Sequence, residues 1–273
     1  MRIASCNILH GIDIRRLSAP GAPLPPDAID LEAVATWIES LDADVVALQE
    51  VDHLLMRSGE RDQVAWLADR LGMEGVFAPA LAGSPDDAWD EAAPGVVEPA
   101  YGVGLLSRVG LDDVVRHRLP FGGAGTREAG ASPVNPGRDR EPRVTLSATV
   151  GEDLRVTTTH LSYMFWWAVP QLGRALRAAT AGHDGPGILV GDVNLPMWGG
   201  WLALHARGLN PWRWPDAATR SAGWRYLPGE ATYPSWKPRI QLDQVFVRHM
   251  PDGVRVSIGP AGPSDHLPLL VDC

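Results

Sequence analysis

The chain has 273 residues, of which 45% are hydrophobic and 21% charged, and its formal net charge is −9. This length is enough to bury a sizeable core, and no apolar run approaches the roughly 20 residues of a membrane span. The acidic balance gives no support for a general electrostatic grip on nucleic acid, which requires basic surface.

Strands and helices alternate along the first part of the chain. Apolar runs and helical spacing predict two strands and two helices, over residues 2–7, 31–41, 44–49 and 64–71. Asp30 is placed to cap the first helix, and Gly72 ends the second. Residues 80–100 are acidic and aperiodic, so they are predicted to form an irregular surface loop.

Strands dominate the second part. Tyr101 to Ser107 and Asp112 to Leu119 are predicted to pair with each other around a turn at Val109 and Gly110. Further patterns predict a hairpin, one helix and four more strands, over residues 143–150 with 154–159, 171–181, 188–190, 243–247, 254–258 and 267–271. Long irregular segments are expected over 120–141 and the Trp-rich 196–240. Nine or ten strands with few helices predict two packed sheets with helices outside.

The rest of the chain is organised around the stretch from Gly187 to Asn194. Ile188 to Val190 indicate a buried strand, and Gly191 is a residue at which the backbone can turn tightly. Asp192 and Asn194 follow, two residues apart and able to point to one side. Buried polar groups at a strand end are costly unless a ligand, metal or reacting water occupies them. An Asx turn ending the strand is the equally open alternative.

Polar residues stand at the ends of other expected strands as well. The full set is Asn7, Glu50, His160, Asp192 with Asn194, Asp243, and Asp265 with His266. Together they supply oxygen ligands for a hard divalent cation such as Mg²⁺, and two imidazoles. Motifs of the form CxxC, HExxH, GxSxG and GxxxxGK[ST] do not occur, which leaves zinc-thiolate, zincin, nucleophile-elbow and P-loop chemistry unsupported.

The sequence favours a single cytoplasmic domain spanning residues 1–273. Nothing resembles a linker between two cores, and Met1 runs directly into the first expected strand without a signal peptide. The two cysteines, Cys6 and Cys273, suit a reducing compartment, although two thiols alone allow a bridge. No obligate protein partner is evident.

These residues carry a family resemblance. The motifs stand in order along the chain: Ser5-Cys6-Asn7-Ile8, Leu48-Gln49-Glu50-Val51, Tyr101-Gly102-Val103-Gly104-Leu105-Leu106-Ser107-Arg108, Thr159-His160-Leu161, Gly191-Asp192-Val193-Asn194, Leu242-Asp243-Gln244-Val245-Phe246 and Ser264-Asp265-His266. The set resembles the endonuclease/exonuclease/phosphatase superfamily, the deoxyribonuclease-I-like group of metal-dependent phosphoesterases. The resemblance implies an α/β (α+β) four-layer sandwich, in which two packed mixed β-sheets are flanked by helices and the site lies across the strand ends.

The resemblance also implies roles for the acidic and amide residues. Glu50 matches the principal metal ligand, with Asn7 beside it and Asp265 as a further ligand, for Mg²⁺ or Mn²⁺. Asp192 resembles the residue that orients or deprotonates the attacking water. Asn194 resembles the one that holds a phosphoryl oxygen.

Both histidines have counterparts in the family. His266 resembles the histidine that is hydrogen-bonded to the scissile phosphate, and Asp243 the residue that fixes its tautomer. His160 resembles the second histidine, which stabilises the pentacovalent phosphate or the leaving oxygen. This histidine favours the deoxyribonuclease, sphingomyelinase and phosphatase branches over the apurinic-site nucleases.

Substrate contacts are expected from a smaller group. Arg140 and Arg143 resemble a family segment that sends an arginine to the site, and Tyr101 opens a motif expected to bind substrate. The tryptophans of residues 196–240 suit loop packing or, alternatively, an aromatic rim around the substrate.

The resemblance implies a phosphoester hydrolase, a phosphodiesterase or phosphatase. Its substrate is expected to be a small molecule, a lipid headgroup or a nucleic acid. Acidic residues outnumber basic ones by 33 to 24, Lys237 is the only lysine, and four arginines could contact one or two phosphates: Arg127, Arg138, Arg140 and Arg143. A small or lipid-linked phosphoester is therefore favoured over the alternative, an endonuclease or exonuclease. A non-catalytic binding protein of the same fold would be expected to have lost a metal-binding or histidine residue.

Overall fold

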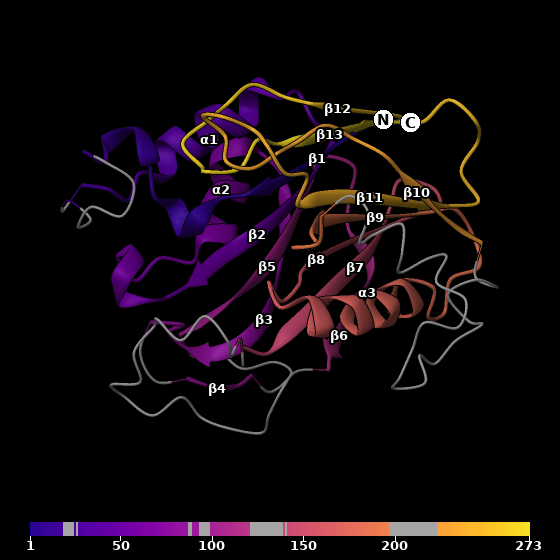
Figure 1. Ribbon diagram of the computed structural model, residues 1–273, viewed down its shortest axis with the longest axis horizontal. Coiled ribbons are helices and arrows are strands. Elements are labelled where there is room, and N and C mark those ends of the chain that lie inside the picture. Colours follow the sequence, from indigo (N-terminus) through magenta and orange to yellow (C-terminus); the bar gives the residue numbers. More distant parts are fainter. Residues whose placement is uncertain are drawn as a thin grey trace.

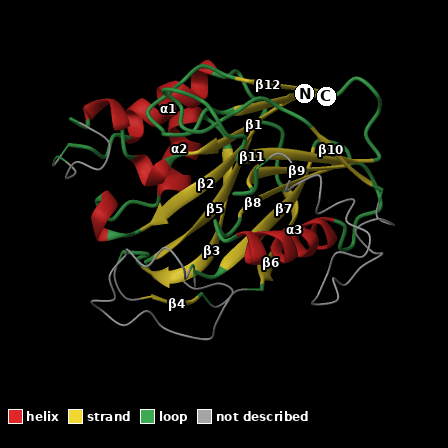
Figure 2. Ribbon diagram, in the orientation of Figure 1, coloured by secondary structure: helices red, strands yellow, loops and turns green. Residues whose placement is uncertain are grey.

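The computed structural model describes residues 1–18, 25, 27–86, 89–92, 99–120, 139, 141–196 and 223–273. These residues form a seven-stranded and a six-stranded sheet, both of mixed direction (Figures 1 and 2). The first sheet has the order β12 (Arg255–Ile258), β13 (Leu269–Asp272), β1 (Arg2–Asn7), β2 (Val45–His53), β5 (Ala100–Ser107), β3 (Glu74–Gly83) and β4 (Trp89–Glu91). The second has the order β10 (Trp224–Leu227), β11 (Asp243–Arg248), β9 (Gly187–Asp192), β8 (Leu154–His160), β7 (Arg143–Val150) and β6 (Asp112–Leu119).

Helices cover the outer faces of the two sheets, which gives the four layers that the sequence predicts. The helices are α1 (Leu31–Ser40), α2 (Gln63–Leu71) and α3 (Phe165–Ala179), with short 3₁₀ turns η1 (Leu9–Gly11), η2 (Ile14–Arg16) and η3 (Met56–Ser58). The first two pack on the seven-stranded sheet and α3 on the six-stranded one. None of the helices in the described ranges is long and apolar enough to cross a membrane.

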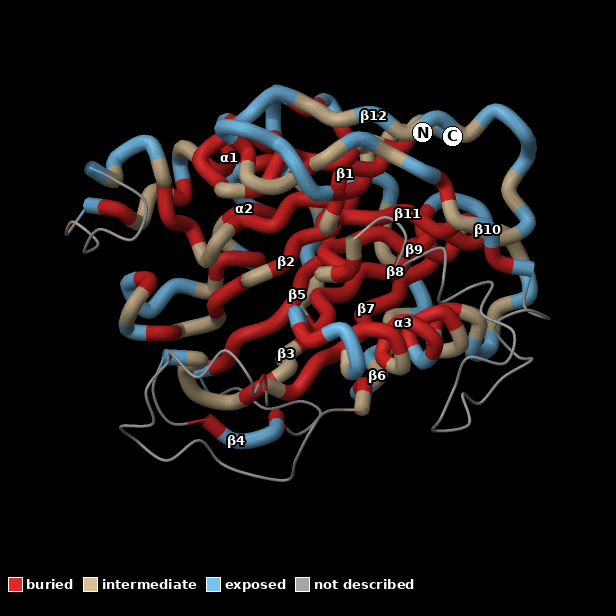
Figure 3. Tube along the Cα trace, viewed as in Figure 1, coloured by how far each residue is buried: buried red, intermediate tan, exposed pale blue. Residues whose placement is uncertain are grey.

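The central strands read as continuous apolar runs because their side chains alternate between two faces that are both buried. Ile3 of β1 faces the core between the sheets, whereas Ala4 faces the helices α1 and α2. In β9, Ile188 and Val190 face the same inter-sheet core, and Leu189 packs beneath α3. Both faces of these strands are therefore apolar, and the buried strands run through the middle of the molecule (Figure 3).

Most predicted helices and strands are present, but the predicted pairing of residues 101–107 with 112–119 is wrong. β5 lies between β2 and β3 in the first sheet, and β6 pairs with β7 at the edge of the second. Gly110, at φ +89°, joins two strands that belong to different sheets. The burial of the strands explains the difference, because every residue of β5 is buried whereas β6 is largely exposed.

Two more strands, and the end of a third, appear where irregular structure was expected. β3 extends to Gly83 and pairs with β4, inside the predicted loop at 80–100, and β10 lies inside the predicted irregular segment at 196–240. A bulge near Pro79 breaks the alternation of β3 that would have revealed it. The remaining parts of these segments, at 87–88, 93–98 and 197–222, lie outside the described residues, as do 121–138.

The helix predicted near 171–181 begins earlier, at Phe165. Pro170 lies inside it, and proline is typical of the first helical turn, so the sequence pattern placed the start too late. Because this earlier start puts α3 a few residues after His160, the end of β8 and the first turn of the helix are held together.

Gly191 is not at a turn, as the sequence suggested, but inside β9, between Thr159 of β8 and Gln244 of β11. A Cβ at this position would lie 2.2 Å from the backbone oxygen of Thr159. Glycine is therefore required by the close approach of two neighbouring strands.

We expect Gly191→Ala to lower the free energy of unfolding by about 3 kcal/mol, because the clash involves backbone and not a movable side chain. Urea denaturation measures the loss. Gly182→Ala is the control, since a Cβ there meets nothing within 4 Å and only the left-handed backbone costs about 1 kcal/mol. Equal losses in the two variants would contradict the steric account.

Candidate functional site

Strand ends from both sheets meet at one open pocket of about 360 Å³. Two parallel pairs, β1 with β2 and β8 with β9, bring their carboxyl ends to the same edge. β11 runs antiparallel to β9, so that its first residue, Asp243, lies opposite Asp192. The predicted site residues that line the pocket are Glu50, Tyr101, Arg143, His160, Asp192, Asn194, Asp265 and His266.

Glu50 is directed toward the pocket by an irregularity in β2. The pairing of β2 with β5 shifts register between Leu48 and Val51, and Glu50 has a left-handed φ of +54°. Such a bulge changes the direction of a side chain, and its strain is characteristic of functional positions. Burial alone would raise the pKa of Glu50. The contact with His10 and the nearby His160 together outweigh burial, and they hold the pKa of Glu50 well below its usual range. The side chain is therefore a carboxylate.

Asn7 joins the two central carboxylates. Its Nδ2 donates to Glu50 Oε1 at 2.9 Å and to Asp192 Oδ2 at 3.2 Å, while its Oδ1 accepts from the Leu9 N–H at 3.0 Å. Asn7 thus presents hydrogen-bond donors to the carboxylates, and it would have to turn its amide over to act as the expected metal ligand.

Asp192 and Asn194 form an Asx turn at the mouth of β9 and also face the pocket. The Asn194 N–H donates to Asp192 Oδ1 at 2.9 Å, and Asn194 Nδ2 donates to the Leu161 carbonyl at 2.9 Å. Burial raises the pKa of Asp192 to about 7, with Asp243 and Glu50 acting in the same direction against His266. The stretch is therefore both an Asx turn that ends the strand and part of the pocket, so the two interpretations drawn from the sequence are compatible.

His266 and Asp243 form a buried pair. His266 Nδ1 lies 2.8 Å from Asp243 Oδ2, and its Nε2 lies 3.8 Å from Asp192 Oδ2. Burial lowers the pKa of His266, but the charges of Asp243 and Asp192 outweigh it and raise the pKa to about 10. The ring of Tyr233 packs against the imidazole at 5.0 Å. His266 is accordingly a fixed imidazolium between two carboxylates.

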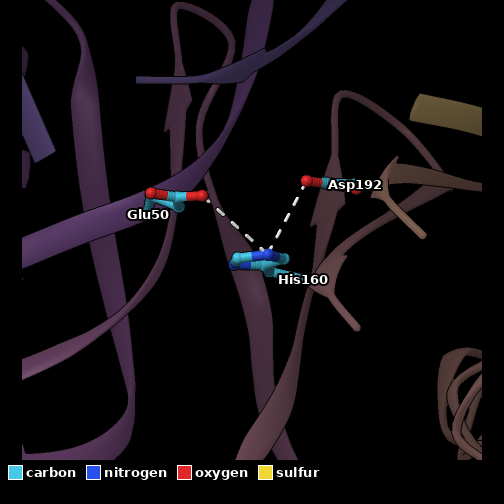
Figure 4. A group of neighbouring side chains, drawn as sticks. All are labelled: Glu50, His160 and Asp192. Carbon is cyan, nitrogen blue, oxygen red and sulfur yellow. Dashed lines mark ion pairs between the residues drawn. The ribbon is translucent and has the colours of Figure 1, made fainter. Parts of the chain in front are cut away.

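His160 lies between the carboxylates of the two sheets (Figure 4). Its Nε2 is 3.6 Å from Asp192 Oδ2 and 4.0 Å from Glu50 Oε1. Burial and the charge of Arg143 lower the pKa of His160 to about 4, so the ring is neutral near pH 7.

These donors fit a divalent cation. One ligand atom each from Glu50, His160 and Asp192 lies within 4.8 Å of the others. Carboxylate oxygens are the ligands that Mg²⁺ and Mn²⁺ prefer. Asp265 lies outside this group of three but lines the same pocket. Its Oδ1 is buried without a hydrogen-bond partner among the described residues, which leaves it available to a ligand.

Arg140, Arg143 and Tyr101 were expected to bind substrate, and two of them lie at the pocket with protein partners of their own. Arg140 lies outside the described residues. Arg143 is 4% exposed and paired with Asp139 at 2.9 Å and Glu141 at 3.2 Å. The Tyr101 hydroxyl faces His160 Nδ1 at 3.4 Å. Both side chains reach the pocket wall, but the Nη atoms of Arg143 and the hydroxyl of Tyr101 already face protein partners.

His10 and Arg57 are among the pocket residues that were not anticipated from the sequence. His10 follows Asn7 in η1 at a left-handed φ of +42°, with its Nδ1 at 3.8 Å from Glu50 Oε2. Arg57 forms a bidentate pair with the buried Asp52 and lies over the Tyr101 ring at 5.4 Å. The only sequence signal for His10 was its closeness to Asn7, and for Arg57 there was none.

Comparisons with known proteins agree with this architecture. A solved endonuclease/exonuclease/phosphatase from Beutenbergia cavernae superposes with a TM-score of 0.61 at 20% identity, covering 99% of this chain and 70% of that one. A family protein from Leptotrichia buccalis gives 0.60 at 16% identity, covering 100% and 98%. Truncated Caenorhabditis elegans TDP2 gives 0.55 at 17%, covering 99% and 95%.

No curated protein sequence matches the chain significantly. The family model described as Endonuclease/Exonuclease/phosphatase family matches residues 4–266, which include every strand end that contributes to the pocket. Enzymes of this family generally hydrolyse phosphoester bonds and typically use a divalent metal. The chain therefore belongs to the endonuclease/exonuclease/phosphatase family.

Proposed function

We propose that the chain is a divalent-metal-dependent phosphoester hydrolase, a phosphodiesterase or phosphatase, and that this pocket is its active site. The observation that carries the proposal is the meeting of Glu50, from the bulge within β2, with His160 and Asp192, from the ends of β8 and β9, within 4.8 Å of one another. Membership of a family of phosphoester hydrolases supports the same reaction class.

Mg²⁺ or Mn²⁺ is the proposed cofactor, held by Glu50 with help from Asp265. When bound, the cation neutralises phosphate charge and acts as a Lewis acid. Glu50 is ionised and fixed by Asn7, which suits a ligand that must not reorganise on binding.

Asp192 is the proposed base for the attacking water. Its Oδ1 is oriented by the Asn194 N–H and its Oδ2 by Asn7, and its pKa of about 7 suits proton transfer near neutral pH. One N–H of the Asn194 amide is committed to Leu161, which fixes the group and leaves the other able to donate to a phosphoryl oxygen.

The two histidines are proposed to stabilise the transition state from preorganised positions. His266 supplies a positive charge that Asp243 fixes from behind, and this charge favours the phosphoryl oxygens as they become more negative. His160 is neutral and directs Nε2 into the pocket, where an N–H can donate to the phosphate or its leaving oxygen.

His10 is proposed to position Glu50. We expect His10→Ala to weaken Mn²⁺ binding roughly tenfold, because Glu50 Oε2 would lose the neighbour that orients it. Calorimetric titration measures the affinity. His53→Ala is the matched control, since its side chain is 16% exposed against 15% for His10, and it pairs with Asp62 outside the pocket. Unchanged affinity in the His10 variant would remove this role.

We propose a small or lipid-linked phosphoester as the substrate. A long duplex needs several protein cations, but the two arginines among the described residues of the pocket wall, Arg57 and Arg143, are each paired with two carboxylates. Exposed aromatic rings lie close in sequence to pocket residues. Tyr163 of the wall is 51% exposed, and Trp166, a few residues further along the chain, is 64% exposed. Such rings suit an apolar substituent of the substrate.

A hydrolysis screen tests this function. With Mg²⁺ or Mn²⁺ present, we expect hydrolysis of bis-(p-nitrophenyl) phosphate or phospholipid to exceed that of RNA and plasmid DNA, with little change between 20 and 300 mM salt. Rapid nicking of plasmid at micromolar DNA, falling steeply with salt, would assign a nuclease instead. Inactivity on all four substrates would favour a binding protein of this fold.

A further inference from the structure

We propose that Arg143 and Tyr101 hold His160 in the tautomer that carries its proton on Nε2. His160 is then a hydrogen-bond donor toward the substrate, and not a ligand of the metal. The role toward substrate rests on the proposed function, whereas the tautomer is a property of the protein alone.

The surroundings of Nδ1 carry the argument. Arg143 Nη1 lies 3.5 Å and the Tyr101 hydroxyl 3.4 Å from His160 Nδ1. A guanidinium has donors only, so this contact is a hydrogen bond only when the lone pair of the imidazole is on Nδ1. A proton on Nδ1 would instead face the N–H of Arg143. In the neutral ring, the single proton is therefore on Nε2.

Arg143 is held in place by its own carboxylate partners. Its Nη2 donates to Asp139 Oδ2 at 2.9 Å and lies 3.2 Å from Glu141 Oε2. The guanidinium is 4% exposed, so it has little freedom to swing toward a ligand. Two carboxylates offset its charge, which suits a positioning residue better than the free phosphate-binding cation that the sequence suggested.

Tyr101 is fixed in a similar way from the other side. The guanidinium of Arg57 lies over its ring at 5.4 Å, and Arg57 donates to both oxygens of Asp52 at 2.9 and 2.7 Å. Asp52 is fully buried, so this support is rigid. The Tyr101 hydroxyl then has a set position from which it donates to Nδ1.

The opposite ring nitrogen faces the pocket. His160 Nε2 lies toward Asp192 Oδ2 and Glu50 Oε1, at 3.6 and 4.0 Å (Figure 4). A nitrogen that carries a proton has no lone pair for a metal. Glu50 is therefore left to bind the cation, and His160 contributes its N–H beside it.

Nitrogen-15 spectra of the histidine rings test the tautomer without any measurement of activity. His160 is assigned by the signal that disappears in His160→Asn. We expect a proton on Nε2 and none on Nδ1, both before and after addition of Mg²⁺. Tyr101→Phe and Arg143→Met should each increase the Nδ1-protonated form. A proton on Nδ1 in the wild type, or loss of the Nε2 proton when Mg²⁺ is added, would overturn the proposal.

Kinetics separate positioning from substrate binding. We expect Arg143→Met to lower kcat by about 100-fold, with KM changed less than about threefold, because nearly all of the molecules would lose the fixed donor on Nε2. Arg155→Met is the matched control, since Arg155 is a buried arginine at the start of β8, away from His160. It should lower stability but leave kcat near the wild-type value. A raised KM with unchanged kcat in Arg143→Met would show that Arg143 binds substrate.

Discussion

Glu50→Gln is expected to lower turnover by roughly 10³-fold or more, which corresponds to about 4 kcal/mol of lost transition-state stabilisation. The substitution keeps the size of the side chain and a partner for Asn7, but it removes a full negative charge from the pocket. Mn²⁺ affinity should fall with it, by at least tenfold. Initial rates on a small diester and calorimetric titration of both proteins measure the two effects.

Asp86→Asn is the control for Glu50. Asp86 lines the same pocket and pairs with Arg57, but its side chain is 67% exposed and so is screened by solvent. Its loss should change Mn²⁺ affinity less than about twofold. If Glu50→Gln binds Mn²⁺ as tightly as the wild type, Glu50 is not a metal ligand.

Asp243→Asn should lower kcat about 100-fold while changing the free energy of unfolding little. His266 would lose the carboxylate that raises its pKa and holds its Nδ1 proton, so the imidazolium would be less favoured at neutral pH. The free energy of unfolding should change little because the same substitution relieves repulsion between Asp243 and Asp192, which face each other across β11 and β9.

Rates between pH 5 and pH 9 measure this effect, with urea denaturation run in parallel. Asp13→Asn serves as the control, because Asp13 is a buried carboxylate paired with Arg15 and lies outside the pocket. Near-normal rates for Asp243→Asn across the whole pH range would show that catalysis does not depend on its pairing with His266.

The layers of the fold could be predicted because its central strands are buried on both faces. Such strands read as apolar runs, and the polar residue that ends each run is visible in the sequence at Asn7, His160 and Asp192. Parallel neighbours then place these ends together at one edge. The apolar runs and the polar residues that end them were thus visible in the sequence, and the family resemblance implied that these strand ends meet.

Features that depend on pairing between distant segments could not be predicted. The sequence near Gly110 is compatible with a hairpin, and only the burial of β5 shows that it belongs between β2 and β3. The bulge that directs Glu50 depends on pairing between β2 and β5. The surroundings of Arg143 depend on Asp139 and His160 meeting across the pocket wall.

Metal add-back to chelator-treated protein tests the central claim most directly. The initial rate on bis-(p-nitrophenyl) phosphate should be negligible in chelator, return with Mg²⁺ or Mn²⁺ in the wild type, and stay low in Asp192→Asn, whose carboxylate is the proposed base. Full hydrolysis in chelator would contradict a metal-dependent site, and equal rates in Asp192→Asn and wild type would contradict the assignment of the reaction to this pocket.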